Sequence, residues 1–245
     1  MRLIDWNSVP RRLALSLLAL SLLFGAGCSM QARQTPATQA EVPGAETSSA
    51  SAAVEAADKP ALVITPNPYL QAPRRVSASG RRIYTQALDA LRQQQWQSAE
   101  QLLKRLTIDE PKLSGPHLNL GLLYRQTGSL ENAEKSFRRA IDVNPNNLDA
   151  YNQLAILKRE AGDFQTAETL YLQALDIWPQ HATSHRNIGI LYDLYLGNFD
   201  QALAHYQTYQ SLQAPPDRQL VGWIVDLQRR MKELARAPAQ ASDSP

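Results

Sequence analysis

Residues 118–145 read LNLGLLYRQTGSLENAEKSFRRAIDVNP, and this stretch predicts two short helices joined by a tight turn. Apolar residues recur at three- and four-residue intervals on both sides of Gly128, which is the spacing of amphipathic helices. Gly128 can adopt the left-handed conformation that ends a helix, and Pro145 stops the second helix. Small side chains at Gly121 and Ala133 allow the two helices to approach closely. We therefore expect an antiparallel helical hairpin.

The same pattern returns every 34 residues, in rows that begin at Gly80, Ser114, Leu148 and Ala182. Similar residues then fall into columns, among them Ala99, Ala133 and Ala167; Trp96, Leu130 and Phe164; Leu103, Phe137 and Tyr171; and Pro111, Pro145 and Pro179. A single hairpin cannot bury its apolar face, so three or more must stack for stability. We expect four hairpins over about residues 80–214, and hence an all-α solenoid.

Thirty-four residues is the period of the tetratricopeptide repeat, and the second row resembles that family most closely. It reproduces the L-G-x2-Y, A-x3-F and terminal Pro pattern with Leu120, Gly121, Tyr124, Ala133, Phe137, Ala140 and Pro145, and has His117 in place of the usual Trp. The third row has Lys158 where the family has Tyr. The first row has Gln86, Ala87 and Ala90 in place of the Leu-Gly and Tyr signature, and the fourth row needs one extra residue before Gly197 to recover the pattern. The outer two repeats are therefore atypical.

The resemblance also implies a binding surface. In that family the first helix of each hairpin lines a concave groove, with positions 2, 5, 9 and 12 of each row pointing into it. Position 9 forms an apolar stripe of Leu88, Leu122, Ile156 and Ile190. Positions 5 and 12 add Tyr84, Leu118, Asn152 and Arg186, and then Leu91, Arg125, Arg159 and Asp193.

Arginine can hold a carboxylate through two parallel hydrogen bonds, so Arg125, Arg159 and Arg186 favour a partner with acidic groups. We expect this groove to bind an extended or helical peptide that also carries apolar side chains. The alternative is that the aliphatic residues pack within the hairpins and the charges are merely solvated.

The amino terminus has the layout of a secretory signal. Residues 13–24, LALSLLALSLLF, are an uncharged apolar run that follows Arg11 and Arg12. The run is shorter than the roughly 20 apolar residues of a membrane-spanning helix, although an uncleaved anchor that extends to about Gly27 is an alternative. We expect a signal peptide over residues 1–27.

Cys28 is the only cysteine, and it directly follows the small residues Gly25, Ala26 and Gly27. In this position it resembles the lipidation cysteine of bacterial lipoproteins, although Gly25 stands where that family usually has an aliphatic residue. The resemblance implies a lipid on Cys28 that tethers the protein. Because the next residue, Ser29, is not Asp, it also implies an outer-membrane lipoprotein that faces the periplasm. Ordinary cleavage after the small residues is the other reading.

Residues 28–79 are rich in Gln, Thr, Ala, Ser and Pro and are predicted to form a flexible linker. The more apolar stretch ALVITPNPYL, residues 61–70, is expected to dock as an extended segment on the first repeat. Pro66 and Pro68 argue against a helix there.

Residues 217–236, DRQLVGWIVDLQRRMKELAR, predict an amphipathic helix. We expect a capping helix over residues 215–236 that covers the exposed end of the stack, followed by a disordered tail over residues 237–245. Arg229, Arg230 and Lys232 leave a membrane-surface role as the alternative.

Charge and motif content exclude several classes of function. Of 25 basic and 23 acidic residues, three Arg and one Asp lie in the signal, which leaves 22 of each sign, whereas phosphate binding needs a clustered basic excess. One cysteine excludes an internal disulfide framework and a multi-Cys zinc site. No phosphate-binding loop or nucleophile elbow occurs. His181 and His185 lack the Glu of an H-E-x-x-H motif and are interpreted as packing residues.

The sequence therefore predicts a non-enzymatic scaffold with no cofactor, metal, nucleic acid or small-molecule substrate. It resembles bacterial outer-membrane tetratricopeptide lipoproteins, which include pilus-secretin pilotins and cell-wall enzyme adaptors. That resemblance implies a protein or peptide partner in the cell envelope and contact with the membrane through a lipid anchor. The alternative is a structural subunit of a pilus, secretion or energy-transducing complex, which would bind through its convex face or last helix.

Overall fold

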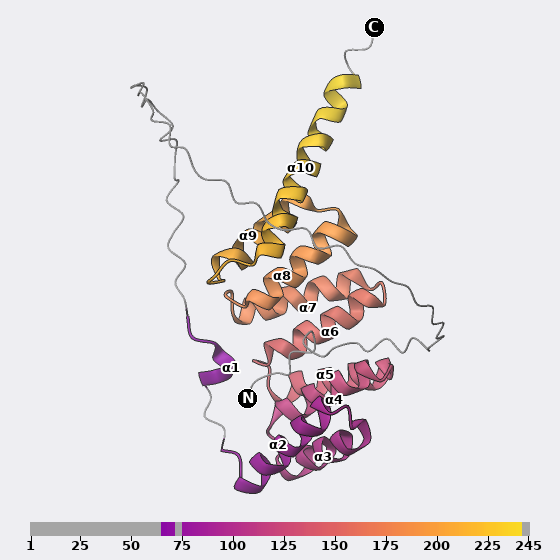
Figure 1. Cartoon of the computed structure of the whole chain (residues 1–245), viewed down its shortest axis with the longest axis vertical. Helices are drawn as coiled ribbons and strands as arrows, with labels where there is room; N and C mark the ends of the chain where they lie inside the picture. The colour runs from indigo at the N-terminus through magenta and orange to yellow at the C-terminus, as the bar shows by residue number, and fades with distance from the viewer. Residues whose placement is uncertain (1–64, 72–74, 242–245) are drawn as a thin grey trace, which may run out of the picture. The chain divides into compact units, whose positions relative to one another are not determined.

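The computed structural model describes residues 65–71 and 75–241, and every regular element in these ranges is a helix (Figure 1). The helices are α1 (Pro68–Gln71), α2 (Ala78–Arg92), α3 (Trp96–Asp109), α4 (Ser114–Gln126), α5 (Leu130–Val143), α6 (Leu148–Glu160), α7 (Phe164–Ile177), α8 (Ala182–Leu191), the π-helix η2 (Tyr192–Leu196), α9 (Phe199–Ser211) and α10 (Arg218–Ala241). Among these residues, none of the helices has the length and apolar character needed to span a bilayer. The expected signal peptide, Cys28 and residues 28–64 of the linker lie outside the described ranges.

Four hairpins follow one another in chain order, each packed on the next (Figure 1). They pair α2 with α3, α4 with α5, α6 with α7, and α8 and η2 with α9; we call the first helix of each pair helix A and the second helix B. Three of the A helices begin at the row starts expected from the sequence, and α2 begins at Ala78. The predicted all-α hairpin solenoid is confirmed.

The turn between helix A and helix B is the same in the first three repeats. In the second repeat Gly128 has a φ of 80°, and the Ser129 N–H donates to the Tyr124 carbonyl oxygen at 2.8 Å, five residues back. Gly162 has a φ of 79° at the equivalent place. The first repeat has Gln94 there, with a φ of 58°, so a residue with a side chain adopts the conformation that favours glycine.

Small residues of helix A face large residues of helix B within a hairpin. A Cβ atom added to Gly121 would overlap the Phe137 ring, and one added to Gly189 would lie 2.6 Å from the Tyr206 ring. Phe137 and Tyr206 are almost completely buried. The small-residue columns of the sequence therefore mark the places where two helices of one hairpin touch.

Neighbouring repeats are tied by one recurring polar contact, between residues 24 apart in sequence. The Tyr124 hydroxyl donates to Glu100 at 2.7 Å, and the Tyr192 hydroxyl donates to Glu168 at 2.6 Å. Each contact links helix A of one repeat to helix B of the repeat before it. We call this set the backward tie.

The fourth repeat contains the extra residue that the sequence predicts, and the backbone absorbs it as the π-helix η2. The Asn198 N–H donates to the Tyr192 carbonyl oxygen at 3.0 Å, six residues back instead of five. Gly197 then ends the helix with a φ of 65°. π-helical structure appears mostly as a single turn of this kind within an α-helix.

Helix α10 covers the last hairpin by packing on α9. Leu220 and Leu227 of α10 are fully buried, and Trp223 packs against the same core. The helix continues to Ala241, whereas the sequence predicts an end at residue 236 and a disordered tail beyond it. Residues 237–241 are helical, and residues 242–245 lie outside the described ranges.

The stretch before the repeats also differs from expectation. Residues 68–71 form the single helical turn α1, although the prolines argue against a helix. Pro68 is the first helical residue, where its missing N–H costs no intrahelical bond. Thr65 contacts Trp178 and Gln180 at the end of the third repeat, not the first repeat.

Candidate protein-binding surface

The apolar stripe expected at position 9 is only partly exposed. Leu88, Ile156 and Ile190 are half-buried, and Leu122 is buried, with 6% of its surface exposed. Part of this stripe therefore stabilises the stack, as the alternative interpretation holds, and the remainder borders solvent.

Most position 5 residues lie inside the stack. Tyr84, Leu118 and Asn152 are buried, as is Leu91 at position 12. Burial is the main cause that raises the pKa of Tyr84 to about 12, and its hydroxyl accepts a hydrogen bond from Asn119 at 3.0 Å.

Asn152 connects the third repeat to the fourth. Its Nδ2 donates to the Ser184 hydroxyl at 2.6 Å, and its Oδ1 accepts from Asn187 Nδ2 at 3.1 Å. Its amide also reaches the Leu148 carbonyl oxygen. A buried side-chain amide with these partners fixes the relative orientation of two helices. A bound peptide could hydrogen-bond to Asn152 only after these internal hydrogen bonds were broken.

Arg125 already holds a carboxylate of its own chain. Its Nη2 lies 2.5 Å from Glu160 Oε1 and its Nε lies 3.3 Å from Glu160 Oε2, so the pair is bidentate. The ion pair joins α4 to α6. Arg125 also donates to Gln153 at 3.3 Å.

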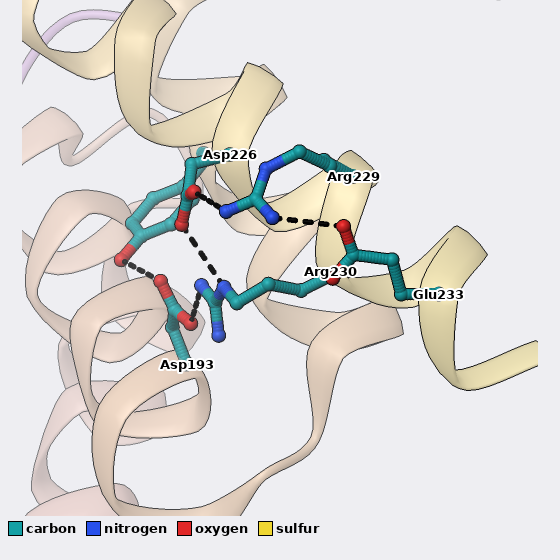
Figure 2. Close-up of polar contacts among 6 residues, drawn as sticks. Asp193, Asp226, Arg229, Arg230 and Glu233 are labelled. Atoms are coloured by element: carbon teal, nitrogen blue, oxygen red, sulfur yellow. Dashed lines mark hydrogen bonds and ion pairs between the residues drawn. The ribbon is translucent and has the colours of Figure 1, made fainter. Parts of the chain in front are cut away.

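Asp193 is closed off by α10 (Figure 2). Only 5% of its side chain is exposed, and Arg230 Nη2 lies 2.6 Å from its Oδ1. The Tyr206 hydroxyl donates to the other carboxylate oxygen at 3.3 Å. Arg230 also bonds to Asp226 on its own helix, so one guanidinium fastens α10 to η2.

Arg159 and Arg186 are the two predicted groove arginines that make no hydrogen bond or ion pair in the described part of the chain. The Arg159 guanidinium lies 5.7 Å from the centre of the Tyr195 ring, and that of Arg186 lies 5.4 Å from the Trp223 ring. Nε and Nη1 of Arg159 are buried and have no acceptor. Aromatic stacking holds both cations in place without satisfying their N–H donors.

Sequence reasoning did not anticipate the exposed apolar side chains at the end of the array. Leu194, Tyr195 and Leu196 of η2 are 66%, 46% and 41% exposed, and Leu234 of α10 is 57% exposed. Leu196 and Leu234 line an open depression of about 520 Å³ together with Phe199 and Met231. The extra residue in the fourth row was the available signal, since a π-turn displaces the side chains next to it.

The histidines near the last repeats serve packing and hydrogen bonding. His185 Nε2 lies 2.8 Å from the Pro179 carbonyl oxygen and so donates to it; its Nδ1 then accepts from His205 Nδ1 at 2.9 Å. Burial lowers the pKa of both rings, that of His205 to about 4. Among the residues described, no three His, Cys, Asp or Glu side chains gather as a metal site would require.

Stacked helical hairpins define an α-solenoid of the kind that generally serves as a non-enzymatic interaction scaffold. Residues 113–180 and 146–213 each match the tetratricopeptide repeat family model. Residues 113–213 of this chain are therefore similar to tetratricopeptide repeats.

Solved structures support the same fold. MamA 41-end from Desulfovibrio magneticus RS-1 is 15% identical, with a TM-score of 0.54 over 69% of this chain and 94% of that one. A structure described as functional characterization of Pseudomonas aeruginosa PilF is 16% identical, with a TM-score of 0.57 over 66% of this chain and 72% of that one. No curated protein sequence matches the chain.

Proposed function

We propose that this protein is a non-enzymatic scaffold of the bacterial cell envelope, tethered by a lipid on Cys28 to the periplasmic face of the outer membrane, where it binds or helps to assemble another envelope protein. The tetratricopeptide repeats support the scaffold role, because such repeats bind other proteins or peptides. The apolar run before Cys28 supports the anchored location.

The observation that carries the binding role is that the guanidinium groups of Arg159 and Arg186 lack a hydrogen-bond acceptor in the described residues. They lie on adjacent A helices beside the half-buried Ile156 and Ile190, and neither guanidinium has an acceptor in the described residues. An unsatisfied buried donor costs about 1–3 kcal/mol, so a partner carboxylate that reached Arg159 would recover part of that cost. We expect a peptide with apolar and acidic side chains, bound with micromolar affinity.

Affinity capture with the full chain tests this role. The double variant Arg159→Ala with Arg186→Ala should lose at least about tenfold in captured envelope partner, as expected for two charge-assisted contacts. The charge-matched control is Arg105→Ala with Arg139→Ala, two exposed arginines on B helices, which should capture as the wild type does. Equal capture by both double variants would exclude these arginines from binding.

Anchoring is tested separately. Labelled palmitate should enter the wild type and not Cys28→Ala, and the label should fractionate with the outer membrane. Equal labelling of the two proteins, or label confined to the inner membrane, would contradict the location.

A second role, as a structural subunit that binds through its last helix, is favoured by the open depression that Leu196 and Leu234 line. A monomer gains nothing from exposing these side chains together, and such patches often mark interfaces. Leu196→Ser with Leu234→Ser should then prevent incorporation into a complex, while the Arg159 and Arg186 variants assemble normally. The opposite result favours the scaffold that binds through its A helices.

A further inference from the structure

Thr65 is bonded to the end of the third repeat by three hydrogen bonds. The indole Nε1 of Trp178 donates to the Thr65 carbonyl oxygen at 3.0 Å and to its Oγ1 at 3.2 Å. The Thr65 hydroxyl in turn donates to Gln180 Oε1 at 2.7 Å. These residues are more than a hundred positions apart in sequence, so the contact is tertiary.

The segment Thr65–Gln71, which we call the strap, has a shape fixed by its own sequence. Pro66 keeps Thr65 in an extended conformation and Pro68 begins α1. Asn67 caps that turn: its Oδ1 accepts from the Tyr69 N–H at 2.9 Å, and its carbonyl oxygen accepts from the Leu70 N–H at 3.0 Å. A preformed segment loses little conformational entropy when it docks.

The receiving surface is equally well fixed. The Trp178 ring lies 5.9 Å from the His181 ring, and His181 Nδ1 lies 2.8 Å from the Ser184 hydroxyl. Ser184 and Asn152 belong to the polar cluster that joins the third repeat to the fourth. The Trp178 ring therefore packs beside the residues that join the third repeat to the fourth.

The strap also contains Tyr69. Tyr69 is half-buried, and its phenol contributes, after burial, to the raised pKa of Tyr84 on α2. Tyr84 is one of the position 5 residues that the family resemblance places in the groove.

We propose that Trp178 and Gln180 form a docking site for an extended chain and that the strap of this same protein is its occupant. The indole N–H recognises a main-chain carbonyl group, which any peptide has. Gln180 accepts from a hydroxyl, so the site favours Thr or Ser, and a following Pro holds that residue extended. A protein partner that uses this edge must displace the strap. The inference does not depend on the arginine surface.

The indole N–H resonance of Trp178 in the full chain tests the proposal. It is assigned through Trp178→Phe, while the indoles of Trp96 and Trp223 serve as internal references. Replacement of residues 65–71 by an equally long Gly-Ser segment should shift the Trp178 resonance and leave both references in place. Thr65→Val, which removes only the hydroxyl, should shift it by a smaller amount; Thr107→Ala, which removes an exposed hydroxyl on α3, should not shift it.

A synthetic peptide of residues 61–74 provides the second measurement. Tethering supplies an effective concentration in the millimolar range, so millimolar peptide should return the Trp178 resonance of the Gly-Ser variant toward its wild-type position. The peptide should have at least tenfold less effect on the wild type, whose site is already occupied. A Trp178 resonance that does not move when the strap is replaced would overturn the proposal, as would equal peptide effects on the two proteins.

Discussion

Lys158 Nζ lies 2.9 Å from the Glu134 carboxylate, in the place that a tyrosine hydroxyl takes in the repeats on either side. Tyr124 bonds to Glu100 and Tyr192 bonds to Glu168 with the same spacing of 24 residues. The departure of the third row from the family pattern is therefore a change of chemistry within a preserved contact. A charged donor replaces a neutral one, and the backward tie is complete in the second, third and fourth repeats.

Removing this donor should weaken the boundary between the second and third repeats. Lys158 and Glu134 are 19% and 29% exposed, so the contact is partly desolvated, and Lys158→Ala should lower the free energy of unfolding by about 1–2 kcal/mol. Lys158→Tyr should stay within about 0.5 kcal/mol of the wild type, because it restores the neighbouring chemistry. Lys135→Ala, which breaks an exposed pair on α5, is the control for urea denaturation. An equal loss in Lys158→Ala and Lys135→Ala would contradict this account.

The first repeat should be stabilised by glycine at its turn. Gln94 has a φ of 58°, where a side chain is strained by about 1 kcal/mol, so Gln94→Gly should raise the free energy of unfolding by roughly 0.5–1 kcal/mol. Gly128→Gln, at the equivalent place of the second repeat, should lower it by about the same amount. Thermal melts measure both, and a melting temperature that falls for Gln94→Gly would be inconsistent with strain at this turn.

Adding a methyl group to helix A of the second repeat should separate its two helices. The new Cβ of Gly121→Ala would overlap the Phe137 ring, and overpacking of this kind costs about 1–3 kcal/mol. Gly222→Ala in α10 meets no neighbour and should stabilise the protein by about 0.5–1 kcal/mol through helix propensity. Phe137→Leu combined with Gly121→Ala should cost less than the two single changes added together. Strict additivity in chemical denaturation would show that the two residues do not touch.

Breaking the ion pair between α10 and η2 should lower the free energy of unfolding substantially. Arg230→Ala leaves the Asp193 carboxylate buried with only the Tyr206 hydroxyl, which should cost about 2–3 kcal/mol. Arg229→Ala is the matched control on the same helix, because Arg229 is 60% exposed and bonds only to its own helix; we expect a change within about 0.5 kcal/mol. Equal unfolding free energies for the two variants would mean that Asp193 needs no cation.

The histidine pair should make the last repeats sensitive to acid. Burial lowers the pKa of His205 to about 4, while an unfolded histidine titrates near 6.5, so the unfolded state binds more protons between these values. The stabilising contribution is complete above about pH 6.5 and is lost as the pH falls toward 4. Asp149 opposes this, because burial raises its pKa to about 6 and its protonation in the fold favours the native state in the same range.

The test therefore compares how the unfolding free energy of the wild type and of His205→Asn depends on pH. From pH 7 to pH 4.5 the wild type should lose about 1 kcal/mol or more of unfolding free energy relative to His205→Asn, which keeps a hydrogen-bonding side chain and does not titrate. Guanidinium denaturation at each pH measures the difference. Parallel pH curves for the two proteins would remove His205 as the cause.

The hairpins could be predicted because their determinants are local. Gly121 and Phe137 lie within one 34-residue row, and the glycine that ends helix A recurs at a fixed place in it. Even the surplus residue before Gly197 was visible as a break in spacing. Backbone sterics then leave few ways to connect the helices, so the period alone predicts the stack.

The surface could not be predicted to the same depth, because it depends on partners far away in sequence. Arg125 is neutralised by Glu160, and Asp193 by Arg230, which belongs to a helix outside the repeats. A residue's position in the family repeat predicts the direction of its side chain. It does not predict which residues of other repeats or helices the side chain contacts. Arg159 and Arg186 remain as candidate contacts only because aromatic rings, not acids, are their neighbours.

The backward tie has a direction. Each hydroxyl or amine of helix A reaches a glutamate that precedes it by 24 residues. In a chain that emerges amino terminus first, from the ribosome or across a membrane, that glutamate already stands on a completed hairpin when its donor arrives. Each new repeat can then form its backward tie as soon as its helix A folds, because the other half of the contact is already in place.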